Sequence, residues 1–538
     1  MCDVLRSNFE DEFPRIEEAI NRAKFIAIDS EFTGLRINNK VRPSLFDDGA
    51  QRYGQLKSGV SQFQICQFGV SAFVKEENEN KYTAYTFNFH IFPSSFGPID
   101  PRFMCQVSSL EFLCTFNFDF NKFIYEGVPF LNRMQEQQLR SILRNQSLFD
   151  GQERDVDEDA LQKACSEVAE WVVEAKDGDT KLINRPKRVA DFILHEELLQ
   201  RFDNIWPERQ AQLNPVILVT KVPVGQRKKL EDMNENSQEY QEERMVNLLK
   251  GFSRVIDLIS NSKKPLIGHN MLLDLMLIHD KFYLPLPDDY LTFKKNIHQL
   301  FPCIIDTKHF SSEIRKSVED SGLLKSTSLG TLYEEMDSDL GKGIVLCQPA
   351  IHHAPGYRKY VDGTAYHEAG FDSFAAGYVF LRMCHMHSLY GLSSMQAAPL
   401  EFSHYMTKTK PFHNNINMIR AAIDHICLDG ADPPSRRPQW LHVQSRTYKL
   451  KTVKLARLFS SHGSVDIKML GERKALVAVA NYRVAKDILK SFHNHEQIKV
   501  AKYNIWRHSP VVRGVMWTGL ALSGGICLWA LFSSQKKD

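Results

Sequence analysis

The chain has 538 residues, too many for a single hydrophobic core, and this length predicts about three domains. Its hydrophobic fraction of 43% is ample for globular folding and excludes a disordered chain. The net charge of +2 is unevenly spread, because residues 401–510 carry 19 Lys and Arg against 8 Asp and Glu. That part is a candidate surface for RNA, or simply a solvated basic face.

The ten cysteines are scattered along the chain and form no Cys-x-x-Cys pair. This usage indicates a reducing compartment and excludes a zinc ribbon or a disulfide framework. The N-terminus is charged and has no long apolar segment, so no secretory signal peptide is predicted.

The first motif follows an apolar run at residues 25–28, which an amphipathic helix at residues 8–23 precedes. The run predicts a buried strand, with Asp29 and Glu31 at its end. Residues two apart on a strand point to the same side, so both carboxylates face one point. Adjacent carboxylates repel unless a cation joins them, and their oxygens suit Mg²⁺ or Mn²⁺. The alternative is that Asp-Ser-Glu is only the polar end of a strand.

The next segment is rich in Pro and Gly, and residues 33–60 are therefore predicted to form loops. Alternating apolar residues predict strands at residues 62–74 and 82–92. Residues 109–117 and 120–127 are predicted to be helical.

A small insert follows an acidic linker at residues 148–159. The insert is predicted to contain two helices and then a strand, at residues 160–175, 188–202 and 215–222. A polar stretch at residues 226–243 is predicted to link it to the remainder of the chain.

The second motif comes after a predicted helix at residues 243–260. A strand at residues 263–268 enters a turn, and residues 270–279 form an apolar helical pattern that contains Asp274. A carboxylate among Leu and Met residues is costly to bury unless it is paired or bound to a metal. The alternative is that Asp274 lies on the wet face of an amphipathic helix.

Two residues between the second and third motifs are weaker candidates. A strand at residues 301–307 contains Asp306, which is predicted to cap a turn rather than to line a site. Lys325 opens the next helix and is either a phosphate contact or a solvated lysine.

The third motif combines His367 with Asp372 at the start of a predicted helix, residues 371–383. Asp372 would lie in the first turn, where the helix dipole tolerates negative charge. His367 would lie in the lead-in, where it could accept a proton from metal-bound water. The alternative for His367 is a surface or capping histidine.

The C-terminal part begins after a Pro- and Arg-rich linker at residues 431–438. Residues 440–505 predict a strand, a helix, two strands, a helix and a strand, the order of an RRM-like module. Leu476 and Ala478 occupy positions where aromatic rings of such a sheet would stack on bases. A degenerate module is therefore predicted, one that docks a protein partner or contacts phosphates.

The last segment, residues 514–532, contains no charged residue. At about 1.5 Å per residue it is long enough to cross a bilayer core, and Trp517 and Trp529 lie near its ends. It predicts a C-terminal membrane anchor, with the rest of the chain on the cytoplasmic face of the endoplasmic reticulum or the mitochondrial outer membrane. The alternative is a buried terminal helix or an interfacial one.

The three motifs together resemble those of the DEDD exonuclease superfamily, in its His-bearing branch. They read Asp29-Ser30-Glu31-Phe32-Thr33-Gly34, Ile267-Gly268-His269-Asn270 before Asp274, and His367-Glu368-Ala369-Gly370-Phe371-Asp372. Within that branch they are similar to the poly(A)-specific ribonuclease family, over roughly residues 1–500. With its apolar C-terminal segment, the chain most resembles the piRNA-precursor trimmers of this family.

The resemblance implies an α/β ribonuclease-H-like exonuclease fold, a mixed sheet flanked by helices. The insert would be a small α+β nucleic-acid-binding-like domain of the Arg-x3-His type. That pattern is absent here, so weakened or altered RNA binding is expected. The predicted domains are a nuclease domain, the insert with its linkers, the rest of the nuclease domain, a degenerate RRM-like domain and a transmembrane helix, at residues 1–147, 148–242, 243–430, 438–507 and 511–532.

The resemblance also implies a catalytic site. Asp29, Glu31, Asp274 and Asp372 would hold two Mg²⁺ ions, for which Mn²⁺ could substitute, and His367 would take the proton of the attacking water. Phe32 would abut the terminal nucleotide, although a role in the core is equally open.

The implied substrate is single-stranded RNA with a free 3′ hydroxyl, trimmed from 3′ to 5′ with release of nucleoside 5′-monophosphates. The implied partners are a PIWI-family protein that holds a piRNA precursor, and a Tudor-domain scaffold. Three alternatives stay open: a poly(A) deadenylase, an inactive RNA-binding adaptor and a DNA exonuclease.

Overall fold

The computed structural model describes residues 3–534, apart from residues 37–41, 97–98, 145–157, 185–190, 210–215, 226, 228–237, 362–364 and 391–397. Most of the predicted acidic linker and much of the second linker lie outside the described residues.

A mixed seven-stranded sheet forms the centre of the structure. Its strands run in the order β1-β4-β3-β2-β8-β9, and β10 pairs with β4. β2, β3 and β4 are antiparallel neighbours, whereas β8 and β9 run parallel to β2. The bounds are β1 (Asp3–Val4), β2 (Phe25–Phe32), β3 (Ile65–Lys75), β4 (Lys81–His90), β8 (Leu266–Gly268), β9 (Ile304–Asp306) and β10 (Ala350–His353). The predicted mixed α/β sheet is confirmed.

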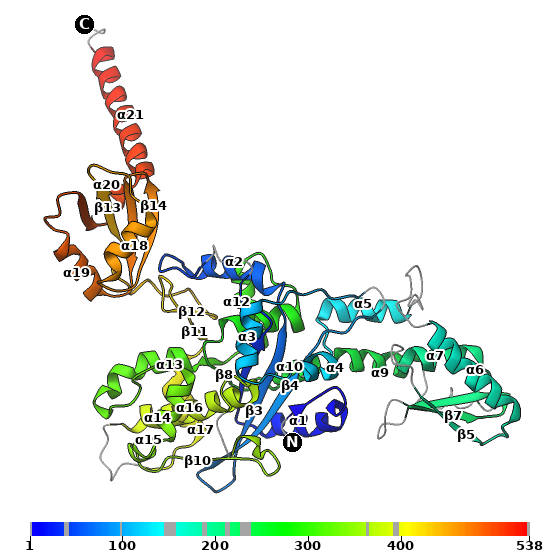
Figure 1. Ribbon diagram of the computed structural model, residues 1–538. Helices are drawn as coiled ribbons and strands as arrows, with labels where there is room; N and C mark the ends of the chain where they lie inside the picture. Colours follow the sequence, from blue (N-terminus) through cyan, green and yellow to red (C-terminus); the bar gives the residue numbers. More distant parts are fainter. Residues whose placement is uncertain are drawn as a thin grey trace.

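Helices cover both faces of this sheet (Figure 1). Alternate residues of β2 enter two different cores: Ile26 and Ile28 pack in one, and Phe25 and Ala27 pack in the other. The first core is closed by α1 (Phe9–Arg22), α10 (Ser253–Ser262), α11 (Leu272–Ile278) and α12 (Tyr290–Leu300). The second is closed by α13 (Thr307–Ile314), α14 (Leu329–Asp337), α16 (Ala369–Leu389) and α17 (Phe402–Thr409). Because it is buried on both sides, β2 reads as a continuous apolar run.

One helix lies where loops were predicted. α2 (Gly49–Val60) starts at a capping box in which Asp48 accepts a hydrogen bond from the Gln51 backbone and the Gln51 side chain accepts one from Asp48. Tertiary burial of Arg52 and Tyr53 stabilises it despite its three glycines. The single helix predicted at residues 243–260 is also wrong, because Gly251 has a φ of +36° and separates α9 (Gln238–Lys250) from α10.

The insert forms a small sheet of its own, in the strand order β5-β7-β6. Its two predicted helices are α6 (Glu158–Glu174) and α7 (Asp191–Arg201), and its predicted strand is β7 (Val216–Lys221). β5 (Thr180–Asn184) and β6 (Ile205–Arg209) were not predicted. In Figure 1 the insert lies beyond α9, away from the central sheet.

The C-terminal module is a four-stranded sheet in the order β14-β15-β13-β16. Its elements follow the predicted order, at β13 (Leu441–Ser445), α18 (Thr452–Ser460), β14 (Val465–Gly471), β15 (Lys474–Val479), α19 (Tyr482–Ser491) and β16 (Ile498–Lys502). The domain boundaries given above stay a prediction.

The predicted C-terminal transmembrane helix is wrong. Residues Pro510–Ser534 form helix α21, which extends away from the C-terminal module (Figure 1). Its four glycines add little apolar surface to it. Among the residues that the structure describes, no helix combines the length and the apolar character needed to cross a bilayer. The predicted anchoring of the chain in the endoplasmic reticulum or mitochondrial outer membrane, which depended on this helix, is therefore wrong as well.

A glycine in β3 determines how closely α16 approaches the sheet. A Cβ at Gly69 would lie 1.8 Å from the backbone oxygen of Ala369, which cannot move without displacing the start of α16. We expect Gly69→Ala to lower the free energy of unfolding by at least about 3 kcal/mol in urea titrations.

Gly54→Ala in α2 is the matched control, since no atom lies within 4 Å of its added Cβ. It should be neutral or stabilising by up to about 1 kcal/mol. Equal stability of the two variants would contradict the close packing of α16 on β3.

Candidate metal-binding active site

The end of β2 carries the carboxylates of Asp29 and Glu31, and the neighbouring strand β3 holds the start of α16. In the antiparallel pairing, Asp29 lies opposite Gly69 and Glu31 opposite Gln67. The Gln67 side-chain oxygen accepts a hydrogen bond from the backbone N–H of Ala369 at 2.9 Å. The start of α16 is thus fixed on β3 next to the two carboxylates.

The lead-in to α16 is held from several directions. The Asn88 side chain of β4 accepts a hydrogen bond from the Gly370 N–H at 3.1 Å and donates one to Glu368 at 2.9 Å. His367 has a φ of +65°, unusual for a residue with a Cβ, and its backbone N–H donates to Asp372 Oδ2 at 3.0 Å. This bond joins the two residues of the third motif.

Asp274 reaches the site through the parallel pairing of β8 with β2, in which Ile26 lies opposite Leu266. The turn after β8 passes through Asn270, whose φ is +62°. Asp306 accepts hydrogen bonds from the backbone N–H groups of Asn270 and Met271 at 2.8 and 3.1 Å and so anchors the turn. The Ser30 hydroxyl then donates to Asp274 Oδ1.

Residues from three distant parts of the chain meet at this point. One ligand atom each of Glu31, His367 and Asp372 lies within 4.8 Å of the others. Asp29 is close enough to Asp372, Asp274 and Glu31 for their charges to perturb it. The structure therefore brings together the five residues that the sequence predicted for the site, while their catalytic roles stay a prediction.

The protein environment disfavours the ionised form of all four carboxyl groups of the site. Burial, and then the charges of Asp372 and Asp274, raise the pKa values of Asp29 and Glu31 well above their usual range. Burial raises the pKa of Asp274 to about 7 against the hydrogen bond from Ser30, and that of Asp372 to about 7 against the one from His367. No Lys or Arg of the described residues is among the causes that lower these four pKa values.

A divalent cation fits this donor set. Four carboxylates supply hard oxygen ligands, which Mg²⁺ and Mn²⁺ prefer, and bound cations would compensate the negative charges whose burial raises the four pKa values. Within the part of the chain that the structure describes, no cation of the protein is among the causes of these four shifts. The residues present therefore suit metal binding better than a structural ion-pair network.

His367 is exposed, and two phenylalanine rings contact it. The ring centroids of Phe112 in α3 (Val107–Thr115) and of Phe116 lie 4.8 and 4.1 Å from that of His367. Partial burial lowers the pKa of His367. At neutral pH the imidazole is thus able to accept a proton.

The two residues predicted to contact RNA, Phe32 and Lys325, lie in different surroundings. Phe32 ends β2 directly after Glu31, and its half-buried ring packs against the first core. Lys325 is exposed at the turn before α14, where its backbone N–H donates to Glu335. No contact that the structure describes joins Lys325 to the carboxylates.

The parts played by Ser30, Phe112 and Phe116 at the site had no usable signal in the sequence. Ser30 bonds Asp274 although strand alternation directs it away from Asp29 and Glu31. Phe112 and Phe116 are one helical turn apart, a spacing that indicates a common helix face but not that His367 packs against it. Asp306 was predicted as a cap, and it does accept hydrogen bonds from the first turn of α13.

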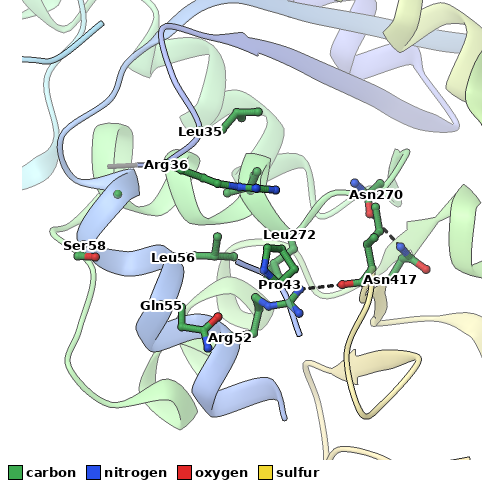
Figure 2. A pocket seen from close by; sticks show the side chains of 13 residues that line it. Leu35, Arg36, Pro43, Arg52, Gln55, Leu56, Ser58, Asn270, Leu272 and Asn417 are labelled. Atoms are coloured by element: carbon green, nitrogen blue, oxygen red, sulfur yellow. Dashed lines mark hydrogen bonds between the residues drawn. The ribbon is translucent and has the colours of Figure 1, made fainter. Parts of the chain in front are cut away.

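A cavity of about 210 Å³ is lined in part by Asn270, Leu272 and Leu273, which directly precede Asp274 in the turn and helix that carry it. Figure 2 shows that it lies between α2, the start of α11 and residues 417–419. The Asn417 side chain donates a hydrogen bond to the Asn270 side chain at 2.9 Å on one side, and aliphatic side chains form much of the wall. These aliphatic residues are Leu35, Pro43, Leu56, Leu272, Leu273 and Ile419.

Comparison with known proteins gives consistent matches. A profile of the CAF1 family ribonucleases matches residues 4–380. The chain is 32% identical over 539 residues to the pre-piRNA 3′-exonuclease trimmer of Bombyx mori, and the match covers 99% of both chains. It is 33% identical to the poly(A)-specific ribonuclease PNLDC1 of Mus musculus, over 94% of this chain and 95% of that one.

A more distant relative extends the same pattern. The poly(A)-specific ribonuclease PARN of Xenopus laevis is 28% identical over 531 residues, which cover 93% of this chain and 80% of that protein.

Proposed function

The chain belongs to the CAF1 family of ribonucleases and is a 3′-to-5′ exoribonuclease, and on this premise we propose that its substrates are the single-stranded precursors of piRNAs. The observation that carries the proposal is the convergence of Glu31, His367 and Asp372 beside Asp29 and Asp274. The similarity to a pre-piRNA trimmer along 99% of both chains supports the choice of substrate.

Each residue of the site has a distinct role in this proposal. Asp29, Glu31, Asp274 and Asp372 would hold two divalent cations, Mg²⁺ or Mn²⁺, which when bound polarise the scissile phosphate and activate water. His367 accepts the proton of the attacking water, for which its exposure and lowered pKa suit it. Ser30 orients Asp274 through its hydrogen bond.

The cavity beside the carboxylates would receive the 3′-terminal nucleotide. Its aliphatic walls suit the flat face of a base, and Asn270 and Asn417 offer amide groups at one end. Asn270, Leu272 and Leu273 line the cavity and belong to the same turn and helix start as Asp274, so a nucleotide bound there would lie against the segment that carries this carboxylate. Phe32 remains a candidate for contact with this nucleotide.

A poly(A) deadenylase is the second candidate function. The names of the mouse and frog relatives favour it, because both are poly(A)-specific ribonucleases. An inactive adaptor would be expected to have lost part of the site, whereas all four carboxylates and His367 are present. A PIWI-family protein and a Tudor-domain scaffold are the partners proposed for the trimming reaction.

Base preference separates trimming from deadenylation. An aliphatic pocket discriminates weakly between bases, so the purified chain with Mn²⁺ should shorten mixed-sequence RNA and poly(A) at rates within about tenfold of each other. Gel analysis of 5′-labelled RNAs measures this. A preference for A above about a hundredfold would favour the deadenylase.

Two controls complete the assay. A 3′-phosphate should block shortening, because the enzyme acts from a free 3′ hydroxyl. Single-stranded DNA of the same sequence should be cut much more slowly; equal cutting would favour a DNA exonuclease.

A further inference from the structure

A carboxylate on the edge strand β14 of the C-terminal module, that of Asp466, contacts the nuclease part. Asp466 accepts a hydrogen bond from the backbone N–H of Leu45 at 2.8 Å and another from Arg420 Nη2 at 2.5 Å. Arg420 Nη1 also donates to the Ser464 hydroxyl at 2.8 Å. Asp466 thus joins two segments of the nuclease part, residues 43–47 and 417–422, which we call the wall segments.

The wall segments are tied to each other inside the protein. Arg52 of α2 forms an ion pair with Asp47 at 3.0 Å, and both side chains are buried. The same guanidinium donates to the backbone oxygens of Ile419 and Arg420 at 2.8 and 2.7 Å. The backbone N–H of Ala422 also donates to the backbone oxygen of Asp47 at 2.8 Å and joins the two wall segments directly.

These segments form one side of the cavity shown in Figure 2. Pro43, Arg52 and Ile419 line it directly. At the far end of the second segment, the Asn417 backbone N–H donates to Asp306, the carboxylate that anchors the turn before Asp274. The contact made by Asp466 therefore continues through Arg420 and Asn417 to the turn that precedes Asp274.

The second wall segment needs external support. Arg420 has a φ of +51°, a conformation that a residue with a Cβ adopts only at an energetic cost. Its charge-assisted hydrogen bond to Asp466 belongs to the stronger class of hydrogen bonds and opposes that cost. The ring of Phe46 packs against Trp440 of the module at a centroid distance of 5.2 Å and adds a second contact.

The sheet of the module is poorly suited to stacking on bases. Leu476 and Ala478 are only 5% and 2% exposed. Helix α20 (Ile505–His508) follows β16, and the ring of His508 stacks on that of His442, the neighbour of Leu476 in the sheet, at 4.2 Å. Part of the face that would bind RNA is therefore covered by the chain itself.

We propose that Asp466 is a positioning residue through which the C-terminal module holds the wall segments in place and so shapes the cavity for the RNA 3′ end. The inference rests on the proposed function of that cavity. It assigns the module a mechanical role at the site in place of base recognition on its own sheet.

The test compares Asp466→Asn and Asp466→Ala in the full chain on two RNAs, one of about 30 and one of about 4 nucleotides. The KM should rise about five- to tenfold for both RNAs while kcat changes less than about twofold, because the carboxylates are untouched. Asp466→Glu should recover part of the loss. Glu472→Gln, which removes an exposed charge from the same module, is the matched control and should leave both constants unchanged.

Two outcomes would overturn the proposal. An unchanged KM in Asp466→Ala would show that the cavity does not depend on this contact. A rise in KM for the long RNA alone would mean that Asp466 acts through RNA bound on the module.

Amide hydrogen exchange separates this inference from the proposed function. Exchange at the backbone N–H groups of Leu45 and Ala422 should become at least about tenfold faster in Asp466→Ala, whether or not the parent chain trims RNA. Unchanged exchange would contradict the positioning role. A parent chain that trims neither RNA would contradict the proposed function instead.

Discussion

Asp29→Asn will lower the rate of RNA trimming by at least about a thousandfold. Asp29 is the carboxylate that feels the charges of Glu31, Asp274 and Asp372 together, so it is central to any cation bound among them. The substitution keeps the shape of the side chain and removes one negative charge. Single-turnover trimming of a 5′-labelled RNA with Mn²⁺ measures the effect.

A control variant separates loss of the site from loss of the fold. Asp11→Asn changes an exposed carboxylate in the first turn of α1 and should retain full activity. Without metal, Asp29→Asn should melt at or above the temperature of the parent chain, because it removes a carboxyl group whose ionised form is disfavoured by burial and by the neighbouring charges. Trimming by Asp29→Asn within about tenfold of the parent would refute the assignment of this carboxylate.

The stability of the folded chain will depend on pH, and the effect of added metal on that stability will depend on pH as well. The pKa values of Asp274 and Asp372 are raised to about 7 in the folded state, so the folded state binds more protons than the unfolded one between about pH 4 and pH 7. Proton binding by these two carboxyl groups stabilises the folded state relative to the unfolded state. This stabilisation is fully present below their unfolded pKa and is lost as the pH rises through about 7. The metal-free chain should therefore lose stability across this range through these carboxyl groups.

Added Mn²⁺ should reverse that loss, because it binds the ionised carboxylates of the folded state. The rise in melting temperature on adding Mn²⁺ should be larger at pH 8 than at pH 5. Buried histidines such as His90 and His309, whose pKa values burial lowers, act in the opposite direction below about pH 6.5.

The comparison is therefore made at each pH with and without metal, and between the parent chain and Asp274→Asn. Asp274→Asn should lose most of the response to Mn²⁺ at pH 8. A melting temperature that Mn²⁺ leaves unchanged at pH 8 would contradict metal binding at these carboxylates.

Local pattern predicted the elements that carry the chemistry. The apolar run before Asp29, the Leu- and Met-rich helix around Asp274 and the helix after His367 all occur where periodicity placed them. Each of these elements is long enough, or apolar enough, to be recognised as a strand or helix from its own residues alone.

Other elements had a weak local signature. α2 was missed because its glycines obscured the helical pattern, although the Asp48–Gln51 capping box was visible in the sequence. The short edge strands β5 and β6 of the insert were missed because five residues carry little periodicity. The C-terminal helix was predicted as a membrane span from its lack of charge, but no helix in the described ranges is both long and apolar enough to cross a membrane.

The order and kind of the acidic residues were enough to name the chemistry, because metal binding depends on residue type and on spacing within a strand or a helix turn. Their meeting in space depended on the register of β2 with β3 and β8, and on Gly69, which lets α16 reach the sheet. The rings around His367, the cavity and the contact of Asp466 with Arg420 likewise join residues tens to hundreds of positions apart. Local periodicity reports only which face of an element is apolar, and it contains no information on which distant element will pack against that face.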